Sequence, residues 1–243
     1  MTMTTASDAD TDESLISSRL LFRLTATIGL LAVLTAAISV VGKNYGEELV
    51  LGGHTASTEI KHVIIGQDAL ALPANVIRFE VQRENHRAQA VSIYLAWPDL
   101  DGYSRANAVR FSDPANAEVL IFADFSQSVM SRDMSGRLEP IYRKLFTGTP
   151  RQGPAGLVIN DLTDKSGFGD EKLLTGTTSS GKIYAVRCIV PQSRRLATSA
   201  DCQRDVHVGR DLTMLYRFSS SLLPQWERIE SGMLAYAAKH IKN

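Results

Sequence analysis

Residues 183–218, IYAVRCIVPQSRRLATSADCQRDVHVGRDLTMLYRF, carry the clearest fold signal in the chain. Apolar and polar side chains alternate over 183–190 and again over 206–218, and a period of two residues is typical of β-strands. The polar connection between them favours pairing of the two strands. Gly209, Arg210 and Asp211 predict a turn that interrupts the second strand.

The only two cysteines of the chain, Cys188 and Cys202, lie at the facing ends of these strands. An oxidising compartment such as the bacterial periplasm would let them pair. A disulfide that closes a loop of about 15 residues contributes roughly 3 kcal/mol in the chain-entropy model. We therefore predict a disulfide, and the alternative is two unrelated buried thiols.

Further strands are predicted on the N-terminal side of this region. Alternation predicts strands at 77–82 and 91–97, joined through the polar stretch 83–89. Apolar runs predict two more strands at 119–125 and 157–159. A second, shorter helix is expected within residues 136–146, after Pro140.

The C-terminus changes to a helical period. The apolar residues of one face are Leu222, Trp226, Ile229, Met233 and Ala237, while Glu227, Arg228, Glu230 and Lys239 lie off this stripe. The expected fold class is therefore α+β: a mostly antiparallel sheet domain with a C-terminal amphipathic helix.

The N-terminal region contains an apolar run. Residues 24–42 carry no charge, and at about 1.5 Å per residue they make a helix of roughly 28 Å, close to the ~30 Å hydrocarbon core. Hydroxyls of Thr25, Thr27, Thr35 and Ser39 can bond back to carbonyls one turn earlier. We predict one transmembrane helix within 19–43. The alternative is a cleaved signal peptide, whose apolar region is normally shorter.

The charges beside this run predict its orientation. Arg19 and Arg23 precede it and Lys43 follows it, so the positive-inside rule favours a cytoplasmic N-terminus. The expected protein is a single-pass protein of the bacterial inner membrane. Its expected parts are a disordered acidic cytoplasmic tail at 1–18, the anchor at 19–43, a juxtamembrane linker at 44–60 and a periplasmic α+β domain at 61–243.

Small residues recur along one side of the predicted anchor, namely Thr25, Gly29, Ala32, Ala36 and Ser39. Such a stripe favours close packing of helices in lipid. It indicates a protein partner or a homo-oligomer formed through the helix. The alternative is coincidence, because much of the span consists of small residues.

Composition excludes several function classes. The chain has 243 residues, 26 basic and 26 acidic, and 44% of its residues are hydrophobic, which excludes a disordered chain. The zero net charge gives no sign of a nucleic-acid partner. Residues 176–182 match a P-loop as far as Lys182, but Ile183 stands where Ser or Thr should bind magnesium. We interpret this stretch as a turn and predict no cofactor.

Two groups of polar residues are candidate sites. Asp205 and His207 are two apart on a predicted strand and could form half of a general-base pair, although a structural polar pair is the more common arrangement. Arg132, Asp133 and Arg137 form a dense polar stretch that could bind an anion or a partner, or be a solvated loop. The scattered histidines predict no metal site.

The chain resembles a family of uncharacterised bacterial proteins with a single transmembrane anchor. The resemblance rests on LPANVIRFE at 72–80, MSRDMSGRLEPIY at 130–142, residues 202–209 and the anchor. It implies the anchored topology and transfers no activity, ligand or catalytic residue.

The function expected from these features is that of a non-enzymatic interaction or accessory protein of the bacterial envelope, anchored in the membrane and working in the periplasm. Two alternatives remain open. A periplasmic hydrolase acting on envelope material would use Asp205 and His207. A small-ligand binding or sensor domain would need an apolar pocket with convergent polar groups.

Overall fold

The computed structural model describes residues 18–51, 53–113, 116 and 118–242. The chain divides into two compact units, residues 1–52 and 53–243. The tail predicted at 1–18 lies outside the described residues, apart from Ser18.

The first unit contains the helix α1, Ser18–Leu51. Its stretch Ser18–Ser39 has a mean hydropathy of 2.0 and is long and apolar enough for a membrane anchor or a signal sequence. The hydroxyls of Thr25, Thr27 and Thr35 donate to carbonyls four residues earlier at 2.8–2.9 Å, as predicted, whereas Ser39 makes no such bond to a described residue. These bonds satisfy polar groups that lipid could not satisfy.

The helix continues beyond the expected anchor, into the stretch predicted as a linker at 44–60. The reason lies in the local sequence. Glu47, Glu48 and Leu49 favour helix, and Gly46 alone does not outweigh them. The helix ends at Leu51, and the described irregular chain begins at Gly53.

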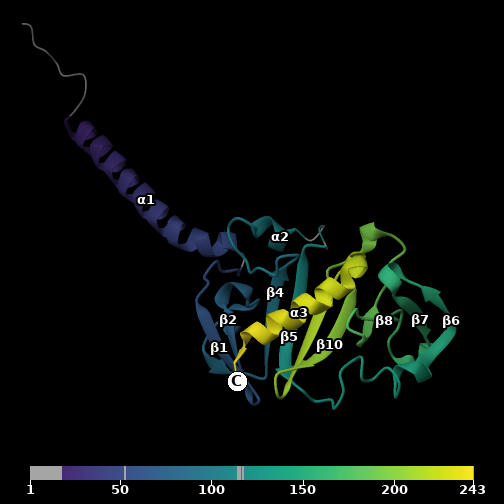
Figure 1. The fold of residues 1–243 in the computed structure, drawn as a ribbon. Helices are drawn as coiled ribbons and strands as arrows, with labels where there is room; N and C mark the ends of the chain where they lie inside the picture. The colour runs from purple at the N-terminus through teal and green to yellow at the C-terminus, as the bar shows by residue number, and fades with distance from the viewer. Residues whose placement is uncertain (1–17, 52, 114–115, 117, 243) are drawn as a thin grey trace, which may run out of the picture. The chain divides into compact units, whose positions relative to one another are not determined.

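The second unit is an α+β domain with two sheets whose strands are mostly antiparallel (Figure 1). The large sheet has eight strands in the order β4-β5-β11-β10-β9-β8-β7-β6, and the small sheet has four in the order β12-β2-β1-β3. The strands are β1 Ile60–Ile65, β2 Asp68–Pro73, β3 His86–Arg87, β4 Ala90–Ala96, β5 Leu120–Gln127, β6 Phe146–Gln152, β7 Val158–Leu162, β8 Lys172–Thr177, β9 Ile183–Cys188, β10 Cys202–Val208, β11 Leu212–Phe218 and β12 Ile241–Lys242.

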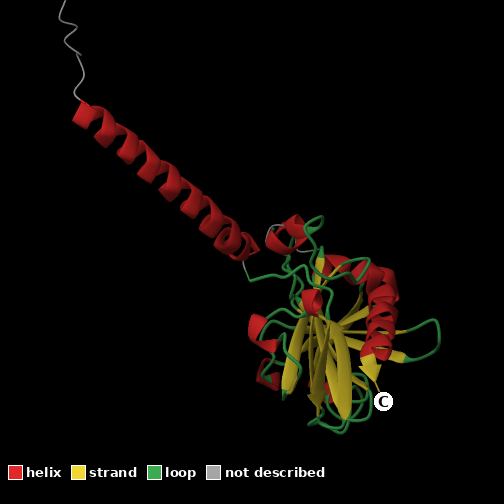
Figure 2. Ribbon diagram, turned by 90° about the vertical axis from the view of Figure 1, so that its left-hand side faces the viewer, coloured by secondary structure: helices red, strands yellow, loops and turns green. Residues whose placement is uncertain are grey.

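Helices and short 3-10 turns complete this unit. The α-helices are α2 Ala108–Ser112 and α3 Trp226–His240, and the 3-10 helices are η1 Ala74–Val76, η2 Glu80–Gln82, η3 Tyr142–Leu145, η4 Pro154–Gly156, η5 Asp164–Ser166, η6 Arg194–Leu196 and η7 Ser220–Gln225. Helix α3 lies across one face of the large sheet (Figure 2). Its predicted apolar stripe is buried, with Ile229, Met233 and Ala237 fully inaccessible. Burial of this stripe fixes which face of the sheet is the main core.

Glu230 departs from the expected pattern of α3. The sequence pattern predicts it among the polar residues off the stripe, but it is only 7% exposed. Its carboxylate receives two hydrogen bonds from the guanidinium of Arg204, at 2.8 and 2.7 Å. The buried partner on β10 therefore explains why an acidic residue faces the sheet.

The predicted strand at 77–82 is wrong. Ile77 forms a single bridge to Ile93, and Val81 is 85% exposed on a 3-10 turn. The guanidinium of Arg83 donates to the carbonyl oxygen of Ile77 at 3.1 Å. A side chain thus satisfies a backbone group that a strand ladder would have paired, and the chain curls there.

The helix expected within 136–146 is not formed, whereas the turn expected at 209–211 is. Residues 136–146 form turns and η3 instead of an α-helix, and β6 already begins at Phe146. The turn predicted at 209–211 separates β10 from β11, as expected. Gly209 has φ of 62°, and a Cβ at this position would lie 2.6 Å from the carboxylate of Asp68, so the turn requires glycine.

Candidate functional site

The large sheet is split between β9 and β10. These strands pair only through Cys202 with Cys188 and Gln203 with Arg187. The two cysteines form the predicted disulfide, with an S–S distance of 2.05 Å. The disulfide therefore holds the two halves of the sheet together at the point where they begin to diverge.

The segment 131–137 occupies the gap beyond the disulfide. The backbone N–H of Met134 donates to the carbonyl oxygen of Asp205 at 3.3 Å. From the other side, the Arg204 guanidinium donates to the Ala185 carbonyl oxygen and to Ser135 Oγ, each at 2.8 Å. A loop and a side chain thus replace the missing strand ladder.

A small second core lies on the face of the sheet opposite α3. It comprises Met134, Leu138, Tyr142, Leu162, Leu173 and Ala185. This core is the reason why residues 134–142 cover the β7–β9 part of that face. The part formed by β5, β10 and β11 remains open beside it.

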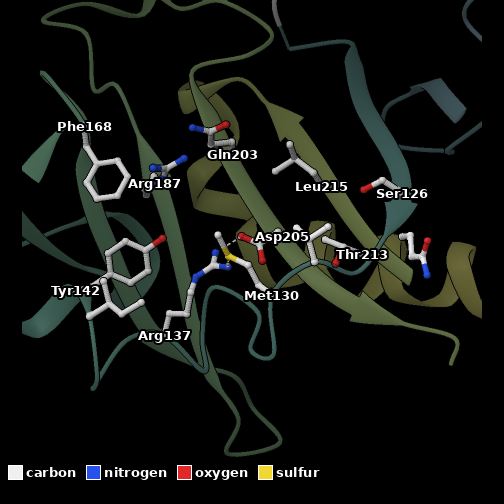
Figure 3. Close-up of a pocket in the computed structure, with 13 residues that line it drawn as sticks. Ser126, Met130, Arg137, Tyr142, Phe168, Arg187, Gln203, Asp205, Thr213 and Leu215 are labelled. Carbon is white, nitrogen blue, oxygen red and sulfur yellow. Dashed lines mark hydrogen bonds and ion pairs between the residues drawn. The ribbon is translucent and has the colours of Figure 1, made fainter. Parts of the chain in front are cut away.

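The candidate functional site is a pocket at this border, with a volume of about 380 Å³ (Figure 3). Strand residues whose side chains point away from the main core form its floor, because side chains alternate between the two faces of a strand. The lining residues are Ser126, Gln127, Val129, Met130, Arg137, Ile141, Tyr142, Phe168, Arg187, Gln203, Asp205, Thr213 and Leu215.

Arg137 and Asp205 meet in this pocket. Their Nη2 and Oδ1 atoms lie 2.5 Å apart, and each side chain is 12% exposed. Arg137 Nη1 also donates to the sulfur of Met130 at 2.7 Å and to the Arg132 carbonyl oxygen at 3.2 Å. Burial lowers the pKa of Arg137, but charge and hydrogen-bond interactions with Asp205 and Tyr142 together outweigh it, so the pKa lies above its ordinary value.

Arg187 forms the other charged side of the pocket. Its guanidinium lies over the ring of Phe168, 4.3 Å from the centroid, and its Nε is 3.4 Å from a carboxylate oxygen of Glu171. Gln203 donates to the other oxygen of Glu171 at 2.7 Å. These contacts orient the plane of the Arg187 side chain, which is 18% exposed.

A second pocket of about 350 Å³ lies on the side of α3. Its buried wall contains Arg204 and Glu230, whose side chains are 4% and 9% exposed. The Tyr216 hydroxyl donates to Glu230 at 2.5 Å, and burial raises the pKa of Tyr216 well above its usual value. This network satisfies both buried charges and connects β10, β11 and α3.

The polar stretch singled out in the sequence divides between the two pockets. Arg137 faces the first pocket, whereas Asp133 lines the second and accepts a hydrogen bond from the Gly136 N–H at 2.8 Å. The Arg132 side chain is exposed, and its carbonyl oxygen contacts Arg137. Among these three residues, Arg137 therefore forms an ion pair with a strand residue, Asp205 of β10.

Asp205 and His207 line different pockets. Asp205 is buried against Arg137 in the first, while His207 is exposed at the second. Within the described part of the chain, neither side chain hydrogen-bonds to the other or to a serine, threonine or cysteine nucleophile. The geometry therefore offers no general-base pair of the kind that the hydrolase alternative requires.

No metal-binding cluster of His, Cys, Asp or Glu is present among the residues that the structure describes. The predicted packing face in α1, Thr25, Gly29, Ala32, Ala36 and Ser39, is exposed along the helix. No described contact tests whether this face packs against another helix, so its role in helix association stays a prediction.

Sequence reasoning missed Arg187, Gln203, Phe168 and Tyr142. One local signal was available for Arg187, because it is the only charged residue in the strand IYAVRC. A charged residue inside a strand of that composition needs a partner or a function. The other three side chains meet it only through the folded topology.

Comparisons with known proteins show no matching family model and no matching curated protein. The solved structure of Smlt3025, an immunity protein of the Stenotrophomonas maltophilia type IV secretion system, is similar, with a TM-score of 0.53 and 14% identity over 79% of this chain and 96% of that chain. The Neisseria meningitidis iron-regulated outer membrane lipoprotein FrpD gives a TM-score of 0.44 and 10% identity over 78% of this chain and 96% of that one. The likeness to Smlt3025 shows a shared fold.

Proposed function

We propose that this protein is an accessory protein of the bacterial envelope that works by binding another protein, not by catalysis. The observation that carries the proposal is the open sheet face around the pocket. There, Val129 is 93%, Met130 56% and Ile141 44% exposed, next to the nearly buried pair of Arg137 and Asp205. Exposed apolar side chains gathered beside polar groups are typical of a protein-interaction surface.

The proposed place of action is the outer side of the bacterial inner membrane. The apolar stretch Ser18–Ser39 supports an anchor, and Arg19 and Arg23 on its N-terminal side support a cytoplasmic N-terminus. The disulfide supports a periplasmic location for the α+β domain. The description of Smlt3025 as an immunity protein of a secretion system is consistent with such a role.

Site-specific photocrosslinking in native membranes tests the proposed function. A photoreactive residue replaces Val129 on the rim in one variant and Val109 of α2, which is 76% exposed, in a matched control. Binding through the open face predicts a defined crosslinked product from position 129 and none from position 109. Equal yields from both positions, or no product from position 129, would contradict the proposal.

A further inference from the structure

Arg187 has hydrogen-bonding capacity that the protein does not use. A guanidinium carries five N–H donors in a planar fork. No side-chain donor of Arg187 makes a hydrogen bond to a described residue, and its Nε is buried. The carboxylate of Glu171 contributes an ion pair at 3.4 Å, and the ring of Phe168 contributes stacking. The two terminal nitrogens therefore have donors available to a ligand in the pocket.

The surrounding contacts give this fork a fixed direction. Stacking on Phe168 restricts rotation of the guanidinium plane, and Glu171 is itself held by Gln203. Figure 3 shows Arg187 beside Gln203, and Asp205 beside Arg137 lower in the same view. An orientation set in advance lowers the entropic cost of binding a planar partner.

The charges in the pocket favour an acidic group over a basic one. Asp205 is already paired with Arg137, and both oxygens of Glu171 face Arg187 and Gln203. The available donors thus belong to a cation, while the neighbouring carboxylates already have partners. A carboxylate matches the geometry of a guanidinium fork through two parallel hydrogen bonds.

The rim indicates what carries this carboxylate. The exposed side chains of Val129, Met130 and Ile141 extend the apolar surface beyond the pocket. A small free acid inside the pocket would leave most of this surface in water. An acidic side chain with apolar neighbours on the same polypeptide would cover it.

We propose that the pocket receives an Asp or Glu side chain of the partner protein, bound by the terminal nitrogens of Arg187, while apolar residues next to it contact Val129, Met130 and Ile141. The inference rests on the proposed function and adds the chemistry of the partner. Arg187 is then the residue that selects an acidic over an amide side chain.

Peptide binding to the full chain in lipid nanodiscs tests this selection. The probes are two fluorescent, C-terminally amidated peptides, acetyl-Leu-Glu-Leu-amide and acetyl-Leu-Gln-Leu-amide, and the readout is fluorescence anisotropy. We expect the Glu peptide to bind about tenfold more tightly, as a charge-assisted pair implies. Arg187→Gln should abolish the preference, and Arg187→Lys, which retains the charge without the fork, should reduce it.

The control is Arg217→Gln. Arg217 lies on β11 outside the pocket and donates to Asp124 at 2.8 Å, so its loss should leave the preference intact. Equal binding of both peptides, no binding of either, or a preference that survives both Arg187 variants would overturn the inference. A photocrosslinked product from position 129 whose yield is unchanged in the Arg187→Gln variant would also overturn the inference, while leaving the proposed function in place.

Discussion

Breaking the buried ion pair of Arg204 and Glu230 should strongly destabilise the domain at the split in the sheet. Replacing Glu230 with Gln leaves the Arg204 guanidinium, 4% exposed, without its counter-charge. Two charge-assisted hydrogen bonds at 2.7 and 2.8 Å are lost or weakened, and Tyr216 loses an anionic acceptor. Breaking a buried ion pair by removing one partner costs about 3–5 kcal/mol.

Urea unfolding of the full chain in detergent, followed by tryptophan fluorescence, measures this loss. Trp226 is 4% exposed beside the network and reports on its integrity. With an m-value of about 2 kcal/mol/M, the lower limit of ~3 kcal/mol shifts the midpoint by about 1.5 M. The matched control is Glu227→Gln, a half-exposed acid on the same helix whose carboxylate accepts a hydrogen bond from the Ser179 N–H, and it should shift the midpoint far less.

A paired substitution separates lost charge pairing from lost packing. Arg204→Met combined with Glu230→Leu removes both charges and keeps apolar volume, so it should recover most of the stability lost in Glu230→Gln. If Glu230→Gln costs no more than Glu227→Gln, the ion pair does not stabilise the domain and the reasoning fails.

Three further predictions concern the disulfide, pH and the anchor. Replacing Cys188 and Cys202 together with Ser should lower the free energy of unfolding by roughly 3 kcal/mol, measured in the same urea assay; an unchanged midpoint would show that the bridge adds no stability. Burial, aided by the charge of Arg83, lowers the pKa of His54 below its usual 6.5. The unfolded chain therefore binds a proton that the folded chain does not, and the free energy of unfolding should decrease as the pH falls below about 6.5. His54→Phe should flatten this part of the stability–pH curve, and an equally steep curve for the variant would refute the role of His54. In membranes, Gly29→Ile on the small-residue face should weaken helix association by ~1 kcal/mol in a crosslinking assay. The control Leu31→Ile, on the opposite face of the helix, should not weaken it. Equal effects of the two substitutions would contradict a specific packing face.

Features with a long, uniform period could be predicted from the sequence. The stripe of α3 from Trp226 to Ala237 is buried as expected, because a helical face needs only one apolar surface to pack against. The apolar run in α1 was equally clear. The disulfide could be inferred because Cys188 and Cys202 are the only cysteines and flank one loop.

Features that depend on distant partners could not be predicted. The stretch 77–82 alternates like a strand, but Arg83 and Gln82 bond to backbone groups that the strand would have used. Glu230 looked like a solvated residue because its partner Arg204 lies on another element. The pocket combines residues from six separate segments, and sequence spacing does not show that Arg187 and Phe168 stack.

The most direct test of binding through the open face is photocrosslinking with mass-spectrometric mapping from three rim positions, Val129, Met130 and Ile141, in native membranes. The account predicts that all three attach to one protein, within one segment that contains an Asp or Glu beside apolar residues. Attachment to unrelated proteins from the three positions, or no product above the Val109 control, would contradict it.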